Sequence, residues 1–254
     1  MTEKSSHMTI QRIFNILEVL ARYPEGLPLR AILEEIGNPP KSSIFVVLQQ
    51  LVRHRIVNYQ EEHRRYKIGP AMINLSAVIM NEHTVQKSAR FGLERLSRLT
   101  GEDTYLGVLD GNRLVYIDKV DGRESIRLNI RVGARRYLHC SSIGKLLLAH
   151  LPREEQMRII EEEGLPGFTA RTITDPEKLF EELENIRRNG YSINDEESME
   201  GIMGIAAPIR DNRQQVVAGI TIFAPVRRAK ENRERYIQLV KETADEISRQ
   251  LGSE

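Results

Sequence analysis

The sequence predicts an N-terminal winged helix-turn-helix, mostly α with a β-hairpin wing, then a linker helix and an α+β C-terminal domain. Three helical stretches and two β-like runs fall within residues 9–69, the order found in a winged helix. Further along the chain, helical stretches and paired strand runs segregate, which is typical of an α+β domain. We place the domains at residues 9–69, 70–83 for the linker and 84–254.

Composition limits the class of protein. The chain has 254 residues, with 37 basic and 36 acidic side chains, so its overall charge points to no partner. A single cysteine excludes an internal disulfide and fits a reducing compartment. The N-terminus shows no apolar leader, and the longest apolar stretch, "AMINLSAVIM", is too short for a bilayer span. We therefore expect a cytoplasmic protein with no membrane partner.

The first three helices follow from apolar spacing. Helical periodicity predicts a first helix over about residues 9–22, which "YPEG" ends, and a second over 29–36, which "GNPP" ends. A third helix begins at Ser42 or Ser43. Its apolar stripe recurs at i, i+3, i+4 and i+7: Ile44, Val47, Leu48 and Leu51.

A hairpin follows directly, because "RIVNYQ" and "RRYKIG" flank a charged tip, "EEHR". Between Pro39 and Gly69 there are six Lys or Arg residues and two acidic residues. Such a basic patch favours binding to DNA phosphates, although a small helical domain with a solvated charged face is the alternative. We expect the third helix to face the major groove and the wing to meet phosphate or the minor groove. The predicted contacts are Lys41, Ser42, Ser43 and Gln49 in the groove and Arg64 and Arg65 in the wing.

The linker helix begins at Gly69-Pro70 and is apolar on most sides. Such a helix should be buried, either against a second subunit or by packing within the chain.

The C-terminal domain reads as helices and strands in a defined order. Helices are expected at about 84–100, 142–150, 153–163 and 176–189, and an amphipathic helix from Ile237 to Leu251 closes the chain. Strands are expected on both sides of the turn "DGN", from Ile126 to Val132, and near 191–194, 202–209 and 215–223.

Three stretches resemble the IclR family of bacterial transcription regulators: "PPKSSIFVVLQQLVRHRIV", "GARRYLHCSSIGKLLLAHLP" and "NDEESMEGIMGIAAPIRDNRQQVVAGITI". The resemblance covers about residues 9–251. It implies a GAF-like C-terminal domain that binds a small organic or aromatic acid, and a homodimer or homotetramer. By position, the resemblance implies these pocket residues: Ser125, Ser142, Ile143, Asn194, Ile202, Gly204, Thr221 and Phe223.

Four positions depart from the family pattern. Members that bind very small oxo-acids usually have an acid at the position of Asn194, a cysteine at that of Gly204 and a serine at that of Phe223. The pocket should therefore be less polar, with room at Gly204 and a ring at Phe223, which argues against glyoxylate or pyruvate. Val46 stands where the family often has arginine in the recognition helix.

The segment "HCSSIGK", residues 139–145, allows three interpretations. Ser142 and Lys145 form an S-x-x-K pair, yet the S-D-N and K-T-G elements of such enzymes do not occur in the chain. His139 and Cys140 lack further ligands at metal-site spacings, so we predict no metal and no cofactor. The third interpretation is a helix start, capped by Ser141, whose N–H groups and Ser142 hydroxyl bind a carboxylate. The alternative is a plain capped core helix.

Lys145 is expected to be ion-paired or to extend toward solvent rather than contact a ligand. Glu196 and Glu197 are adjacent on a loop or strand, so we expect them to face solvent or to hydrogen-bond a turn.

Together these features predict an effector-responsive repressor of a catabolic operon that binds a double-stranded DNA operator and is not an enzyme. Effector binding in the C-terminal domain would change the placement of two winged helices in a dimer. The alternatives are a small-molecule hydrolase that uses Ser142 and Lys145 beside an accessory winged domain, and a structural DNA-binding protein without a ligand.

Overall fold

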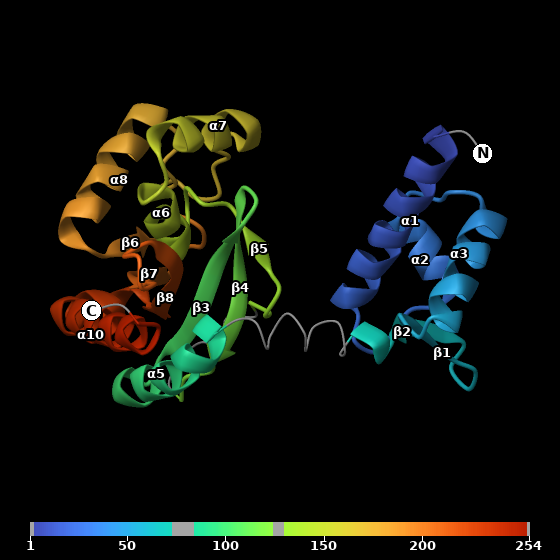
Figure 1. Ribbon diagram of the computed structural model, residues 1–254, viewed down its shortest axis with the longest axis horizontal. Coiled ribbons are helices and arrows are strands. Elements are labelled where there is room, and N and C mark those ends of the chain that lie inside the picture. Colours follow the sequence, from blue (N-terminus) through green and yellow to red (C-terminus); the bar gives the residue numbers. More distant parts are fainter. Residues whose placement is uncertain (1–2, 73–83, 124–129, 253–254) are drawn as a thin grey trace. The chain divides into compact units, whose positions relative to one another are not determined.

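The structure, a computed structural model, describes residues 3–72, 84–123 and 130–252. The chain divides into two compact units, residues 1–82 and 83–254, each with its own hydrophobic core (Figure 1). Most of the predicted linker, residues 73–83, lies outside the described residues, and so does Ser125.

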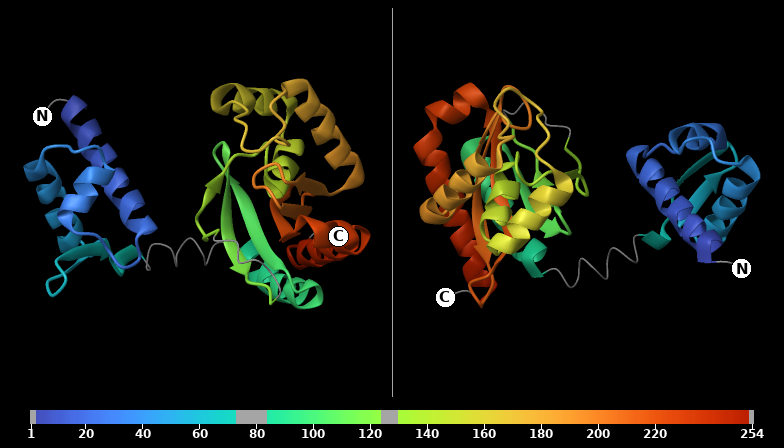
Figure 2. Two further views of the ribbon diagram at one scale, coloured as in Figure 1. Left: turned by 180° about the vertical axis from the view of Figure 1, so that it is seen from behind. Right: turned by 90° about the horizontal axis from the view of Figure 1, so that it is seen from above.

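The N-terminal unit has the predicted order of three helices and a hairpin (Figure 2). Ile16, Ile32, Ile44 and Leu48 are fully buried where the three helices meet. The first helix begins earlier than predicted, because the polar residues before position 9 have no apolar period yet contain no helix breaker. The elements are α1 (Glu3–Arg22), α2 (Leu29–Glu35), α3 (Lys41–Arg53), β1 (Val57–Gln60) and β2 (Arg65–Ile68).

The hairpin confirms the predicted wing. Strands β1 and β2 pair antiparallel. Leu27, just before α2, forms a bridge with Tyr66 through backbone hydrogen bonds of 2.9 and 2.8 Å, which ties the hairpin to the helices. Arg64 adopts a left-handed conformation at the turn, with φ 51°.

The C-terminal unit is built on a six-stranded sheet in the order β5-β4-β3-β8-β7-β6, with every neighbouring pair antiparallel. It confirms the α+β prediction and the hairpin around "DGN". The strands are β3 (Asp103–Asp110), β4 (Arg113–Val120), β5 (Arg135–Arg136), β6 (Ser192–Asp195), β7 (Ile202–Arg210) and β8 (Val216–Pro225).

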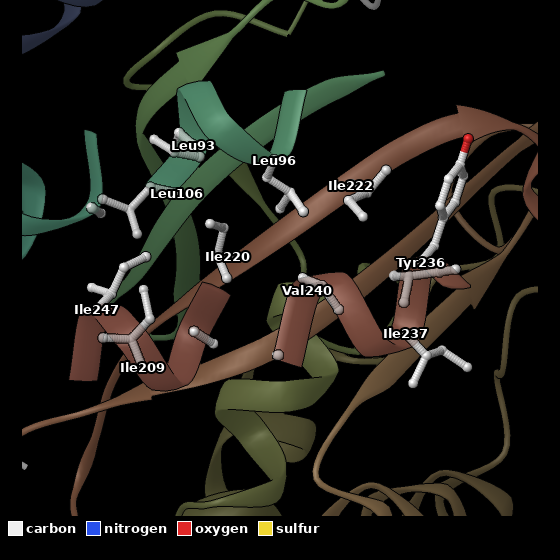
Figure 3. Close-up of a cluster of buried hydrophobic side chains, with 14 of the residues drawn as sticks. Leu93, Leu96, Leu106, Ile209, Ile220, Ile222, Tyr236, Ile237, Val240 and Ile247 are labelled. Atoms are coloured by element: carbon white, nitrogen blue, oxygen red, sulfur yellow. The ribbon is translucent and has the colours of Figure 1, made fainter. Parts of the chain in front are cut away.

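Helices cover both faces of this sheet (Figure 1). One face packs against α5 (Thr84–Thr100) and α10 (Arg233–Gln250), and Figure 3 shows Leu93, Val240 and Ile247 from these helices meeting Leu106 and Ile220 from the strands. The second core lies on the α6 side of the sheet. That side carries α6 (Ser142–Ala149), α7 (Arg153–Glu163) and α8 (Pro176–Asn189).

A pair of glycines sets the depth of α6. Gly107 and Gly219 are register partners on β3 and β8. A Cβ atom on Gly219 would lie 2.8 Å from the Ile143 side chain, and one on Gly107 would lie 2.5 Å from Leu114 and 3.3 Å from Ile143. All eight residues of α6 are buried. The glycines therefore let this helix approach the sheet more closely than any side chain would allow.

Two local expectations differ from the structure. The strand predicted from Ile126 is absent over its described part, residues 130–132, because the chain turns at Gly133 with φ 86°. Strand β5 forms just afterwards and pairs with the edge of β4. A short helix, α9 (Val226–Glu231), precedes α10, and its charged sequence has no apolar period that would predict it.

Candidate functional site

The outer face of α3 carries the predicted DNA contacts. Lys41, Ser42 and Gln49 are exposed on it. Ser43 is half-buried, and its hydroxyl accepts a hydrogen bond of 2.7 Å from Arg12 on α1. Ser43 therefore already holds α1 against α3, and its hydroxyl is less available to a base than the other three side chains.

Two apolar side chains share this exposed surface of α3. Phe45 is 40% exposed and Val46 is 57% exposed, whereas the opposite face of the helix is buried. Arg64, in the turn between β1 and β2, and Arg65, the first residue of β2, are both exposed. An exposed valine on a helix that enters the major groove can contact a thymine methyl group.

The start of α6 has the predicted serine cap. The Ser141 hydroxyl accepts a hydrogen bond of 3.1 Å from the Gly144 N–H and donates to the Tyr137 carbonyl at 3.1 Å. A Cβ atom on Gly144 would lie 2.5 Å from the Leu138 carbonyl oxygen. The glycine therefore serves the close packing of the preceding segment against the helix.

Four pocket candidates pack against one another between α6 and the strands β7 and β8. The hydroxyl oxygens of Ser142 and Thr221 lie 3.0 Å apart, and Thr221 also donates to the Ile205 carbonyl at 3.0 Å. A Cβ atom on Gly204 would lie 2.7 Å from both the Ser142 hydroxyl and the Phe223 ring. The space at Gly204 is thus filled by the Phe223 side chain.

A pocket of about 290 Å³ opens beside this layer. Of the predicted residues, Ile202 and Phe223 line it; Ser142, Ile143, Asn194, Gly204 and Thr221 are buried outside the lining. The volume is at the lower end of the range for small-molecule sites. The described residues of the lining are Arg113, Tyr116, Ile130, Arg135, Arg136, Tyr137, Cys140, Ser141, Phe168, Ser198, Met199, Ile202 and Phe223.

The pocket is aromatic inside and basic at one side. The rings of Tyr116 and Phe223 meet edge to face with centroids 6.3 Å apart. Arg113 lies over the Tyr137 ring at 3.5 Å from its centroid. Among the described residues of the lining there are three arginines and no carboxylate. Its charge therefore favours an anionic ligand over a cation.

Lys145 is buried and forms ion pairs with two carboxylates. Its ammonium lies 2.6 Å from the Glu197 carboxylate and 3.0 Å from that of Glu182, and its side chain is 1% exposed. Because the ammonium is held by carboxylates and Ser142 bonds to Thr221, Lys145 does not serve as a base for Ser142. The hydrolase interpretation is therefore wrong, and the expected ion pairing of Lys145 is confirmed.

Glu197 differs from the expectation of a solvent-facing residue. It is buried, and one of its oxygens, Oε2, has no hydrogen-bond partner among the described residues. Burial raises the pKa of Glu197, and the Lys145 ammonium opposes that rise. Its neighbour Glu196 does hydrogen-bond a turn, accepting from the Gly201 N–H at 2.8 Å.

Asn194 holds the turn that contributes Ser198 and Met199 to the pocket. Its side-chain oxygen accepts from the Glu197 N–H at 2.8 Å, and its amide donates to the Ser198 hydroxyl at 2.8 Å. The position therefore shapes the pocket wall rather than lining the pocket.

Cys140 lines the pocket as a buried, protonated thiol. Burial raises its pKa to about 12, so little thiolate is present at neutral pH. This agrees with a packing role.

Comparison with known proteins identifies the family. The family model for the helix-turn-helix domain of IclR matches residues 9–61, and the model for the C-terminal domain of bacterial IclR regulators matches residues 77–249. The chain belongs to the IclR family. It is thus a helix-turn-helix transcriptional regulator, as the resemblance implied, and not an enzyme.

Individual relatives of this IclR protein agree. The regulator KdgR of Escherichia coli K12 is 32% identical over 98% of this chain and 95% of its own. The repressor AllR of the same strain is 34% identical over 84% of this chain and 79% of its own. An IclR homologue from Microbacterium hydrocarbonoxydans, solved with 4-hydroxybenzoate, is 25% identical with a TM-score of 0.84 over 96% of this chain and 98% of that one. No helix in the described part of the IclR chain is long and apolar enough to cross a bilayer.

Sequence reasoning missed most of the pocket wall of this IclR protein. Arg136 and Tyr137 lie in the segment "GARRYLHCSSIGK", in which the predicted ligand contact was the serine at the helix start. Phe168 and Met199 lie on connections between elements, where no periodicity marks them. The sequence feature that could have indicated these pocket residues is the pair of adjacent arginines, Arg135 and Arg136, shortly before the helix cap.

Proposed function

We propose that this IclR-family protein acts in the cytoplasm as a repressor of a catabolic operon and responds to a small organic acid. The observation that carries the proposal is the 290 Å³ pocket inside the unit that lacks the helix-turn-helix. A ligand there can regulate DNA binding without competing for the DNA face. The relative AllR, which is named a repressor, supports the repressor role, and the homologue solved with 4-hydroxybenzoate supports the response to an organic acid.

The operator would be read by α3 and the wing. Lys41, Ser42 and Gln49, which are exposed on α3, would reach the major groove, with Val46 among them as an apolar contact. Arg64 and Arg65 would contact phosphates or the minor groove. Ser43 would act through its bond with Arg12.

Regulation requires two copies of the winged helix on one operator. We expect a homodimer through the N-terminal unit and the linker, residues 70–83, or a homotetramer of two such dimers. An effector that changes the placement of the two winged helices changes how well they match the two half-sites.

The effector would lie between Ile202, Phe223 and the aromatic side of the pocket. Ser142, Thr221 and Gly204 support Phe223 from below, so they fix the floor of the site. The position of Ser125 is expected to contribute as the resemblance implies.

The test measures both units of the full-length protein. Organic acids that raise its thermal stability are added to complexes with DNA from the upstream region of its own gene, and DNA affinity is measured by fluorescence anisotropy. Ile202→Trp should fill the pocket, abolish the response to these acids and leave affinity without effector unchanged. Ile202→Val, which removes one methylene, is the matched control and should keep the response. A response that persists in Ile202→Trp, with normal folding, would place the effector elsewhere.

A further inference from the structure

We propose that Arg136 binds the acidic group of the effector at the side of the pocket, while the apolar body of the effector lies against Tyr116, Ile202 and Phe223. The ligand class is a small acid with a compact apolar or aromatic body. This inference rests on the proposed function, and it assigns a residue and an orientation that the sequence did not predict.

Arg136 differs from the other two arginines of the pocket. Arg113 forms an ion pair with Glu163 and lies over Tyr137. Arg135 forms an ion pair with Asp110 and donates to the Asp110 carbonyl at 3.1 Å.

Arg136 donates only to the backbone carbonyl of Arg135, at 3.1 Å, and has no ion pair with any residue in the described ranges 84–123 and 130–252. Burial raises the pKa of both Tyr116 and Cys140, and the positive charge of Arg136, which lines the same pocket, partly opposes that rise. Among the three described arginines of this wall, Arg136 is therefore the one whose charge no carboxylate balances.

The start of α6 is less suited to the acid. Ser142 is fully buried and bonds to Thr221, and the Ser141 hydroxyl already caps Gly144. The Phe223 ring occupies the space beside Gly204 that would lead to Ser142. An acid that enters the pocket therefore meets aromatic and aliphatic side chains on the inner side and the Arg136 guanidinium at the β5 side.

Cys140, the single cysteine of the chain, provides a probe because it lines the same pocket. Iodoacetate and iodoacetamide are close in size and alkylate the same thiolate, but only iodoacetate is an anion. We would measure both alkylation rates on the full-length protein at pH 9 by mass spectrometry. Their ratio cancels the thiolate fraction and the general accessibility of the thiol, and it reports the preference of the pocket for a carboxylate.

Arg136→Gln should lower the ratio of the iodoacetate rate to the iodoacetamide rate by about tenfold, the effect of losing a hydrogen bond to a charged group. Arg135→Gln removes the same charge from the adjacent residue, which Asp110 balances, and should change the ratio far less. Equal ratios in the wild type and Arg136→Gln would overturn the inference. So would a folded protein that reacts with neither reagent although both label it in urea.

The outcome separates this inference from the proposed function. Suppose that a neutral compound alters DNA binding while Arg136→Gln leaves the alkylation ratio unchanged. The role of Arg136 would then be wrong and effector regulation would stand. If the ratio falls as expected but no compound alters DNA binding, the anion site would stand and the proposed regulation would be wrong.

Discussion

The Phe223 side chain determines where the cavity of the C-terminal unit lies, because its ring fills the space beside Gly204. The sequence placed Gly204 and Phe223 on paired strands, and they are indeed register partners on β7 and β8. It did not show that the Phe223 ring would fill the space left open by the glycine. Packing of side chains from three elements decides that, and no periodicity encodes it. The members of the buried layer were thus predictable, whereas the position of the cavity was not.

We predict that the Lys145 ammonium stabilises the folded protein by balancing the buried Glu197 carboxylate. Lys145→Met leaves the Glu197 carboxylate buried without its cation, which should destabilise the protein by about 3–5 kcal/mol at pH 8. Without the cation the pKa of Glu197 should rise further. The folded state then holds the proton to higher pH than the unfolded state, so stability is full below about pH 4.3 and is lost as pH rises through the folded pKa. Urea unfolding of the variant and wild type at several pH values measures this difference.

The matched control is the double variant Lys145→Met/Glu197→Gln. It removes the charge that causes the pH dependence, so its stability relative to the wild type should vary much less between pH 5 and pH 8. A loss in Lys145→Met that is the same at every pH would show that packing, and not the uncompensated carboxylate, causes the destabilisation.

The elements differ in how much of them the sequence reveals. Helices α7 and α8 match their predicted bounds because the apolar period agrees with the residues at their ends: Pro152 and Gly164 flank α7, and Asp175 as cap and Gly190 as terminator flank α8. Strand β5 has only two residues at a sheet edge, which is too short for any alternation. Arg136 lies on β5, so the proposed acid-binding residue was hidden in an element that the sequence could not show.

We predict that the wing contributes to the salt dependence of DNA binding. Arg64→Ala/Arg65→Ala should weaken binding to all DNA sequences and reduce the slope of log affinity against log salt by about 2, because two phosphate contacts are lost. Arg213→Ala/Arg227→Ala removes two exposed charges from the C-terminal unit and should leave the slope unchanged. Fluorescence anisotropy titrations at several salt concentrations measure this slope for both variants and the wild type. An unchanged slope in the wing variant would remove the wing from the interface.

At the scale of the whole molecule, the two units have separate cores and separate tasks. We expect full-length protein to be a dimer or tetramer in size-exclusion chromatography with light scattering. Residues 84–252 alone should still bind the acid, because every described lining residue of the pocket lies in that range. A monodisperse full-length monomer at micromolar concentration would contradict the assembly on which two-site operator binding depends.

The paired glycines beneath α6 have a consequence for redesigning this protein as a biosensor. Gly107 and Gly219 let Ile143 rest directly on the sheet, so α6 cannot sink further, and a larger residue at either glycine would push the whole buried helix outward. New ligand preferences are therefore more readily engineered at another part of the pocket wall, at Arg136, Phe168 and Met199, whose side chains are in contact with solvent. A mutagenesis library confined to that wall should retain folded members far more often than one directed at the α6 floor.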